Sequence, residues 1–136
     1  MKKDLFLRDS FKVFILIIGF AITAASSANA ASVTATLAKT SKSVSTAYIG
    51  NTTGAYKLSG AVGTLSKYQI EYVVFAGPNS NGCTYVIMRK IIPTGGSFTV
   101  NTTVSKSHTV AKTTLYSNKQ TSNTAGATGN CIFSNY

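Results

Sequence analysis

Few side chains in this sequence could take part in acid–base chemistry. Beyond residue 30, His108 is the only histidine and Glu71 the only acidic residue. Hydrolysis of glycosides by paired carboxylates needs a second acidic group. A Ser-His-Glu triad could be drawn from His108 and Glu71, but no G-x-S-x-G motif positions a serine nucleophile. We therefore predict no catalytic residues and no enzymatic activity.

The same shortage applies to metals and cofactors. A calcium or magnesium site built from carboxylates needs more acidic ligands than Glu71 alone. A zinc site would need His108, Glu71 and both cysteines, and we expect the cysteines to be joined to each other. The sequence contains no phosphate-binding loop and no G-x-G-x-x-G motif. We expect neither a metal nor any other cofactor.

Cys83 and Cys131 are the only cysteines. An isolated pair in an exported protein favours one intramolecular disulfide. Such a bridge would close a loop of about 50 residues and contribute about 4 kcal/mol in the chain-entropy model. It would hold the C-terminal segment beside the start of the strand that follows Cys83. Two free thiols or an intermolecular bridge are the alternatives.

The first 30 residues predict export. The basic stretch MKKDLFLRDSFK precedes the apolar run VFILIIGFAITAA, which is too short for a bilayer core of about 30 Å. Ala28-Asn29-Ala30 then forms an A-x-A cleavage site. We expect residues 1–30 to be a Sec signal peptide and residues 31–136 to be one mature domain, secreted by way of the periplasm. An uncleaved N-terminal anchor is the alternative.

Positive charge dominates the predicted mature chain. Nine lysine and arginine side chains follow residue 30, against Glu71 alone, which gives a formal net charge of +8. A field of one sign attracts anionic partners, although it also serves solubility. The adjacent pair Arg89 and Lys90, with Lys67 and Lys106, are the candidate anion-binding residues, and an arginine can form a forked pair with a phosphate.

The expected partners follow from this charge. They are phospholipid headgroups such as phosphoinositides, or acidic glycans, reached by peripheral membrane contact. Nucleic acid ranks below them, because the sequence contains no recognisable nucleic-acid-binding module.

The elements that must position these residues are mainly strands. In residues 31–40, apolar Val33, Ala35 and Leu37 alternate with threonines, as in a half-buried strand. Residues 67–76 and 83–92 flank the turn-rich sequence GPNSNG and predict an antiparallel hairpin. The alternation in SFTVNTTV predicts a further strand.

Two adjacent cations, Arg89 and Lys90, lie near the end of the predicted hairpin. Residues 85–88 are apolar on both faces and predict a central strand that is covered on both sides. Arg89 and Lys90 must then point to opposite faces. We interpret the pair as the point where the strand leaves the core.

Three segments complete the predicted architecture. Residues 41–49 and 108–116 could each form a helix or a strand, and residues 117–130 are small and polar, which predicts a flexible loop. The predicted fold is mainly β, a sandwich-like antiparallel sheet with one disulfide, or α+β with one or two short helices.

In its signal peptide and size, the chain resembles the small, single-disulfide exoproteins that Gram-negative bacteria release by type II secretion. In size, strand pattern, signal peptide and the expected disulfide, it also resembles the chaperone–usher pilins. It departs from the pilins in its late cysteines and in Asn135, where they carry a penultimate tyrosine. We expect a secreted, virulence-associated, non-enzymatic binding protein or effector that docks on anionic surfaces, as a monomer or small homo-oligomer. The alternative is a structural or adhesive surface subunit, as the likeness to pilins implies.

Overall fold

The computed structural model describes residues 32–51, 54–120 and 124–135, and the predicted signal peptide lies outside them. Within these residues all regular structure is β-strand, and no helix is long and apolar enough to cross a membrane. The strands are β1 (Ser32–Leu37), β2 (Ser43–Ser45), β3 (Ile49–Gly50), β4 (Ala55–Val62), β5 (Ile70–Gly77), β6 (Tyr85–Ile92), β7 (Ser97–Thr103), β8 (Val110–Ser117) and β9 (Gly129–Asn135).

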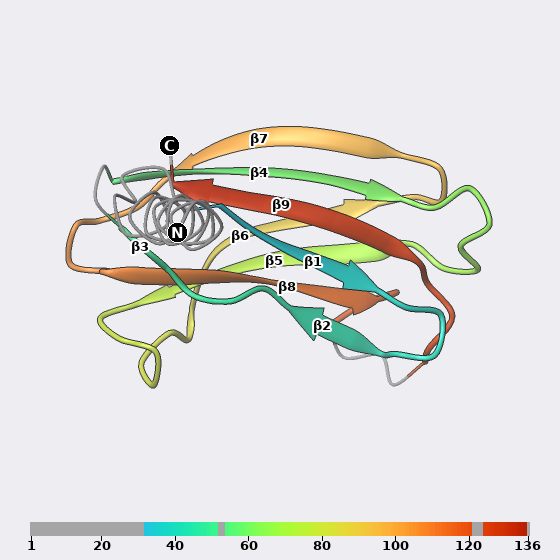
Figure 1. Cartoon of the computed structure of the whole chain (residues 1–136), viewed down its shortest axis with the longest axis horizontal. Coiled ribbons are helices and arrows are strands. Elements are labelled where there is room, and N and C mark those ends of the chain that lie inside the picture. The colour runs from blue at the N-terminus through green and yellow to red at the C-terminus, as the bar shows by residue number, and fades with distance from the viewer. Residues whose placement is uncertain (1–31, 52–53, 121–123, 136) are drawn as a thin grey trace, which may run out of the picture.

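The strands form two antiparallel sheets packed as a sandwich (Figure 1). Sheet A has the order β1-β9-β4-β7. Sheet B has the order β2-β8-β5-β6, and β3 also pairs with β8. The prediction of a β-sandwich is confirmed, and the helices of the α+β alternative do not occur in the described residues.

Alternating side chains of both sheets fill the space between them. The predicted inward face of β1 is confirmed, with Ala35 and Leu37 buried and Val33 packed against them. Period-2 alternation lets one face of each strand pack on the core while the other faces solvent. The largest fully buried side chains are Tyr56, Tyr72, Phe133, Leu37, Leu58, Ile70 and Leu115.

The predicted hairpin is confirmed, with β5 and β6 paired antiparallel from Ile70 opposite Ile92 onward. The two ambiguous segments are strands rather than helices. Residues 43–45 and 49–50 pair with β8, and the backbone N–H of Thr46 donates to the carbonyl oxygen of Thr113 at 2.9 Å. Pairing with β8 therefore satisfies backbone groups that a helix would have satisfied internally.

Strand β6 is the edge of sheet B, so the prediction of a central strand at residues 85–88 is wrong. The central strand of the hairpin is β5, in which every residue except Phe75 is buried. Both strands carry apolar residues on both faces, but only β5 has a neighbour on each side, β6 and β8. Apolar composition alone does not distinguish a central strand from an exposed edge.

The edge position also corrects our interpretation of the two cations. Arg89 and Lys90 are exposed because β6 has a free side, and the strand returns to a buried residue at Ile92. They pair with Val73 and Tyr72 respectively. Neighbouring residues of a strand face opposite sides, so the expectation that the two cations point apart agrees with the register.

The two cysteines are both free and buried, so the predicted Cys83–Cys131 disulfide is wrong. Cys131 lies in β9 of sheet A, opposite Gly60 of β4. Cys83 lies against sheet B, with its Sγ atom 3.3 Å from the carbonyl oxygen of Phe75. Tyr72 is the residue of sheet B beside Gly60, and Phe75 lies three residues, about 10 Å, further along β5. A disulfide requires Cα atoms within about 7 Å, which this separation does not allow.

We therefore expect reductant to leave the melting temperature unchanged. Both thiols should resist labelling in the folded protein, because Cys83 and Cys131 are buried, and both should react once the chain is denatured without reductant. Mass spectrometry after alkylation measures the number of labelled thiols. If the denatured, unreduced chain takes up no label, the cysteines are joined in a disulfide and this prediction is wrong.

The connection after β8 is shorter than the predicted flexible loop of residues 117–130. Ser117 is the last residue of β8, and Gly129 begins β9. Ala127 is fully buried, and its N–H donates to the Ser117 hydroxyl at 3.3 Å. Small residues allow this close packing, while the mobility of the stretch stays a prediction.

Candidate functional site

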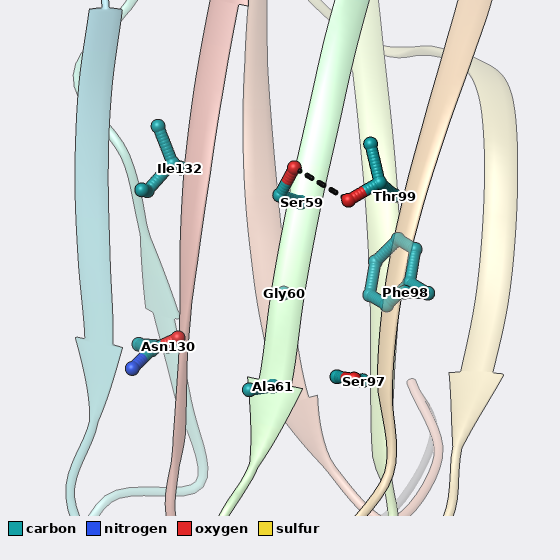
Figure 2. A pocket seen from close by; sticks show the side chains of 8 residues that line it. All are labelled: Ser59, Gly60, Ala61, Ser97, Phe98, Thr99, Asn130 and Ile132. Atoms are coloured by element: carbon teal, nitrogen blue, oxygen red, sulfur yellow. Dashed lines mark hydrogen bonds between the residues drawn. The ribbon is translucent and has the colours of Figure 1, made fainter.

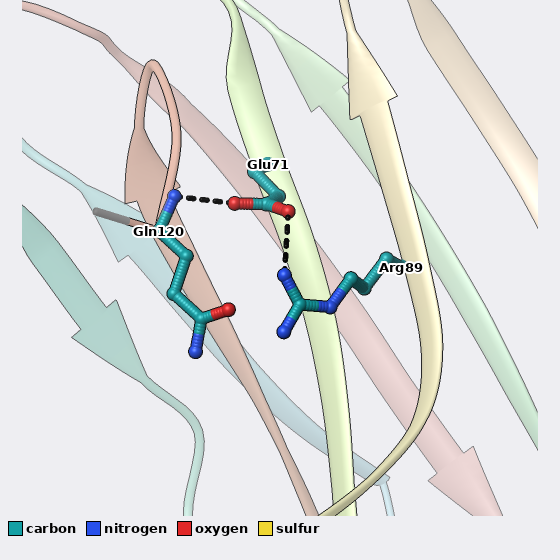
Figure 3. A network of polar contacts seen from close by, with 3 residues as sticks. All are labelled: Glu71, Arg89 and Gln120. Carbon is teal, nitrogen blue, oxygen red and sulfur yellow. Dashed lines mark hydrogen bonds and ion pairs between the residues drawn. The ribbon is translucent and has the colours of Figure 1, made fainter. Parts of the chain in front are cut away.

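Arg89 forms an ion pair with Glu71 that links neighbouring segments of the fold. Its Nη1 lies 3.4 Å from Oε1 of Glu71, the neighbouring side chain on β5 (Figure 3). The Glu71 side chain is 7% exposed and that of Arg89 is 49% exposed. The second carboxylate oxygen of Glu71 accepts a short hydrogen bond from the N–H of Gln120. The pair therefore joins β5, edge strand β6 and the segment after β8, and its arginine is not a free anion site.

The other predicted anion-binding residues are not brought together with it. Lys90 is exposed on the edge strand. Lys67 follows β4, with its Nζ 5.3 Å from the centre of the Tyr68 ring, and Lys106 follows β7. Because β4 and β7 are antiparallel in full register, the connections that carry Lys67 and Lys106 lie at opposite ends of the sandwich.

A different feature, missed by sequence reasoning, is a hollow on the outer face of sheet A (Figure 2). It is open to solvent and has a volume of about 410 Å³. The short side chains of β4 form its floor, and Asn130 and Ile132 of β9 and Thr99 of β7 stand on either side of it. The register sets two rows across the three strands, Ser59 between Ile132 and Thr99, and Ala61 between Asn130 and Ser97.

Tyr72 of sheet B supports the floor of this hollow from inside the sandwich. Its hydroxyl lies 3.1 Å from the carbonyl oxygen of Ala61 and 3.2 Å from that of Asn130. Its ring packs edge-on against Phe98, with centroids 4.8 Å apart. Gly60 is required above this ring, because a Cβ there would collide with Tyr72 and Phe98. The two sheets are thus tied together directly beneath the hollow.

Burial shifts the titration of the groups between the sheets. Burial, with a smaller effect of nearby Cys83, raises the pKa of Tyr56 to about 12. Burial, with a smaller effect of nearby Cys131, also raises the pKa of Tyr72. Burial raises the pKa of Cys131 to about 11, against the opposing effect of a backbone hydrogen bond at Ala35. These groups stay protonated in the folded protein at pH values where the unfolded chain begins to lose protons.

We expect the free energy of unfolding to fall from about pH 9 upward. Cys131 has an ordinary pKa of 9.0 and Tyr56 of 10.0, so the unfolded chain binds fewer protons than the folded one above those values, and stability decreases with pH. Urea denaturation at about pH 8, 10 and 11 measures the loss. Tyr56→Phe should reduce the loss above pH 10, whereas the exposed-site control Tyr85→Phe should not. Stability that is constant over this range would contradict the burial of these groups.

Strand β6 forms an exposed apolar edge. Tyr85 is 60%, Val86 41% and Ile91 49% exposed. Tyr85 also stacks on His108 with ring centroids 4.9 Å apart, so this histidine packs against an aromatic ring. Among the described residues no three His, Cys, Asp or Glu side chains gather where they could hold a metal ion.

No protein-family model matches the chain, and no curated protein matches its sequence. The K3 cleaved adhesin domain of Lys-gingipain from Porphyromonas gingivalis W83 is 7% identical over 68% of this chain and 62% of that domain, with a TM-score of 0.48. This chain therefore spans less than two thirds of the length of that domain. A disulfide-linked pilus protein of Bacillus endospore appendages is 16% identical over 77% of this chain and 81% of that one, with a TM-score of 0.42. A mitogen derived from Yersinia pseudotuberculosis is 15% identical over 79% and 85%, also with a TM-score of 0.42. Likenesses this distant leave the activity of this chain open.

Proposed function

We propose that this protein is a structural or adhesive subunit of a bacterial surface, and that copies associate through strand β6. The observation that carries the proposal is the exposed apolar edge of sheet B. An edge strand presents unpaired backbone N–H and C=O groups, which can pair with an extended strand of another chain. Burial of Val86 and Ile91 against such a strand adds apolar contact to the backbone hydrogen bonds.

The other edges of the sandwich are less suited to this role. At the far edge of sheet B, β2 has three residues and β3 has two, and short strands are a common way to protect an edge. The two edge strands of sheet A are β1 and β7, and their outward-facing residues are mainly serine, threonine and asparagine. Among the described strands, β6 combines length with exposed apolar side chains.

Charge repulsion between copies is reduced at this edge. A formal net charge of +8 on residues 31–136 opposes association, but exposed charges are screened over about 8–10 Å at physiological salt. The charge of Arg89 is balanced by Glu71. Among the residues that the structure describes, Lys90 is the cation of β6 that no ion pair balances. We therefore expect association to strengthen as salt rises.

Sedimentation and electron microscopy of residues 31–136 test the proposal. We expect species larger than a monomer, with head-to-tail pairing giving filaments and symmetric β6 pairing giving dimers. Val86→Lys with Ile91→Lys should give monomers. The matched control, Asn101→Lys with Thr103→Lys on edge strand β7, adds the same charge and should still assemble. A parent protein that stays monomeric at every concentration and salt contradicts the proposal, as does equal loss in both double variants.

Docking on anionic surfaces stays a prediction. Its four candidate residues do not share one surface, and Arg89 is paired with Glu71. The positive charge of the chain can still attract anions at long range.

A further inference from the structure

The hollow on sheet A is lined by hydroxyl, amide and aliphatic groups, without an ionisable side chain. The hydroxyl oxygens of Ser59 and Thr99 lie 3.0 Å apart and share one hydrogen bond. That bond uses one of the two hydroxyl protons, so the pair can still donate one hydrogen bond and accept others. Asn130 is exposed beside them and offers both donors and acceptors. This set of groups is complementary to a ligand with many hydroxyl groups.

The same hollow offers apolar contact beside its polar groups. Ile132 is 53% exposed on the β9 side, and the Thr99 methyl group and Ala61 add small apolar surface. The Phe98 ring lies beneath the floor against Tyr72. A sugar ring carries hydroxyls around its rim and C–H groups on its faces, so it can use the polar and the apolar lining together. Ligand sites usually combine apolar lining with a few polar groups that fix orientation.

Other classes of ligand fit the hollow less well. An anion would find no cation in the lining. The nearest lysine of β4, Lys57, lies outside the hollow, one row further along the same face. A peptide strand needs an open sheet edge, whereas the floor strand β4 is paired on both sides. A protein interface would usually place Tyr, Trp or Arg anchors at its centre, and this lining contains none.

We propose that this hollow binds an uncharged polysaccharide chain. The polar face continues past the hollow onto β1, where exposed Thr34 pairs with Ile132 and exposed Thr36 with Asn130. Contact points on such a face recur at about 4.8 Å across the strands and about 6.6 Å along them. An extended chain of sugars can therefore meet several rows at once, which a single sugar cannot do.

The site is held rigid before any ligand arrives. The hydroxyl of Tyr72 holds the backbone at Ala61 and Asn130, and β4 is hydrogen-bonded to β7 and β9 along its length. A pre-organised site loses little conformational entropy on binding. The hollow lies on the outer face of sheet A, whereas the β6 edge belongs to sheet B. Copies joined through β6 would present several hollows, which would add avidity.

An NMR titration tests the proposal without relying on assembly. The protein is residues 31–136 carrying Val86→Lys and Ile91→Lys, which removes the exposed apolar edge. The probes are cellohexaose, xylohexaose and chitohexaose, with hexagalacturonate as the acidic comparison. We expect at least one neutral hexamer at millimolar concentration to give saturable shifts of the amide signals of Ser59, Ala61, Thr99 and Asn130.

Two matched variants then locate the site. Ala61→Gln fills the floor and should weaken binding about tenfold or more, equivalent to about 1.4 kcal/mol. Thr103→Gln lies outside the hollow on the same face and should leave the affinity unchanged. If Ala61→Gln does not fold, Ser59→Ala replaces it, with a several-fold loss expected. The proposal is overturned if no neutral hexamer binds, if the shifts fall elsewhere, or if both glutamine variants bind alike. Saturable shifts with hexagalacturonate alone would favour anionic ligands instead. Failure of β6 assembly would not affect any of these readings.

Discussion

Tyr72→Ala is expected to lower the free energy of unfolding by about 3–5 kcal/mol, the range seen when large aromatic side chains are removed from a core. Tyr72 is fully buried, packs on Phe98 of the other sheet and reaches two backbone carbonyl oxygens of sheet A. Its loss leaves a cavity and removes a hydrogen bond between the sheets. Small domains are stable by only about 5–15 kcal/mol, so this variant should be partly unfolded at 37 °C.

Two further variants separate the ring from its hydroxyl. Tyr72→Phe keeps the ring and should cost about 1 kcal/mol for the lost hydrogen bond. Tyr56→Phe should cost nothing at neutral pH, because the Tyr56 hydroxyl is buried with no hydrogen-bond partner among the described residues. Tyr85→Ala, at an exposed edge position, serves as the control for aromatic loss. Urea midpoints provide the comparison, and equal losses for Tyr72→Ala and Tyr85→Ala would contradict the burial of Tyr72.

Arg89→Ala is expected to cost about 1–2 kcal/mol of stability, while Lys90→Ala should stay within about 0.5 kcal/mol. Removal of Arg89 leaves the buried Glu71 carboxylate without its cation, and a buried charge that loses its partner is costly. The partial exposure of Arg89 keeps the effect below that of a fully buried pair. Both variants remove one positive charge from the same strand, so a net-charge effect predicts equal results.

A double-mutant cycle with Glu71→Gln isolates this contact. In the Glu71→Gln background, Arg89→Ala should cost much less than in the parent, because no carboxylate is left uncompensated. The measurement is urea denaturation at neutral pH. Additive losses would show that Arg89 acts through something other than Glu71.

The alternation of residues along single strands was enough to predict the inward face of β1 and the β5–β6 hairpin. Val33, Ala35 and Leu37 repeat with the period of a strand, and GPNSNG sets the turn between two apolar runs. Such patterns are local, so the sequence expresses them directly. Ser59 and the threonines of β7 are present in the sequence, but nothing in their order shows that Ser59 and Thr99 lie side by side.

The features that the sequence did not predict depend on which strands become neighbours. Residues 85–88 look like a central strand, but β6 is the edge of sheet B, where Tyr85 and Val86 are exposed while Ile87 and Met88 pack against the core. Cys83 and Cys131 look like a natural pair until Cys131 is placed in sheet A and Cys83 against sheet B. The hollow needs Ser59, Thr99 and Ile132 from three separate strands in register. Long-range pairing therefore decides the candidate sites.

Hydrogen exchange of the β6 backbone amides is the most direct test of association through this strand. The assembled parent protein is compared with the Val86→Lys, Ile91→Lys variant, and the peptides covering residues 85–92 are followed by mass spectrometry. We predict slower exchange of amides in β6 on assembly, because the free side of the strand gains hydrogen-bond partners, with the exposed edge β7 unchanged. Assembly that leaves β6 exchange unaltered, or protects β7 in its place, would contradict the account.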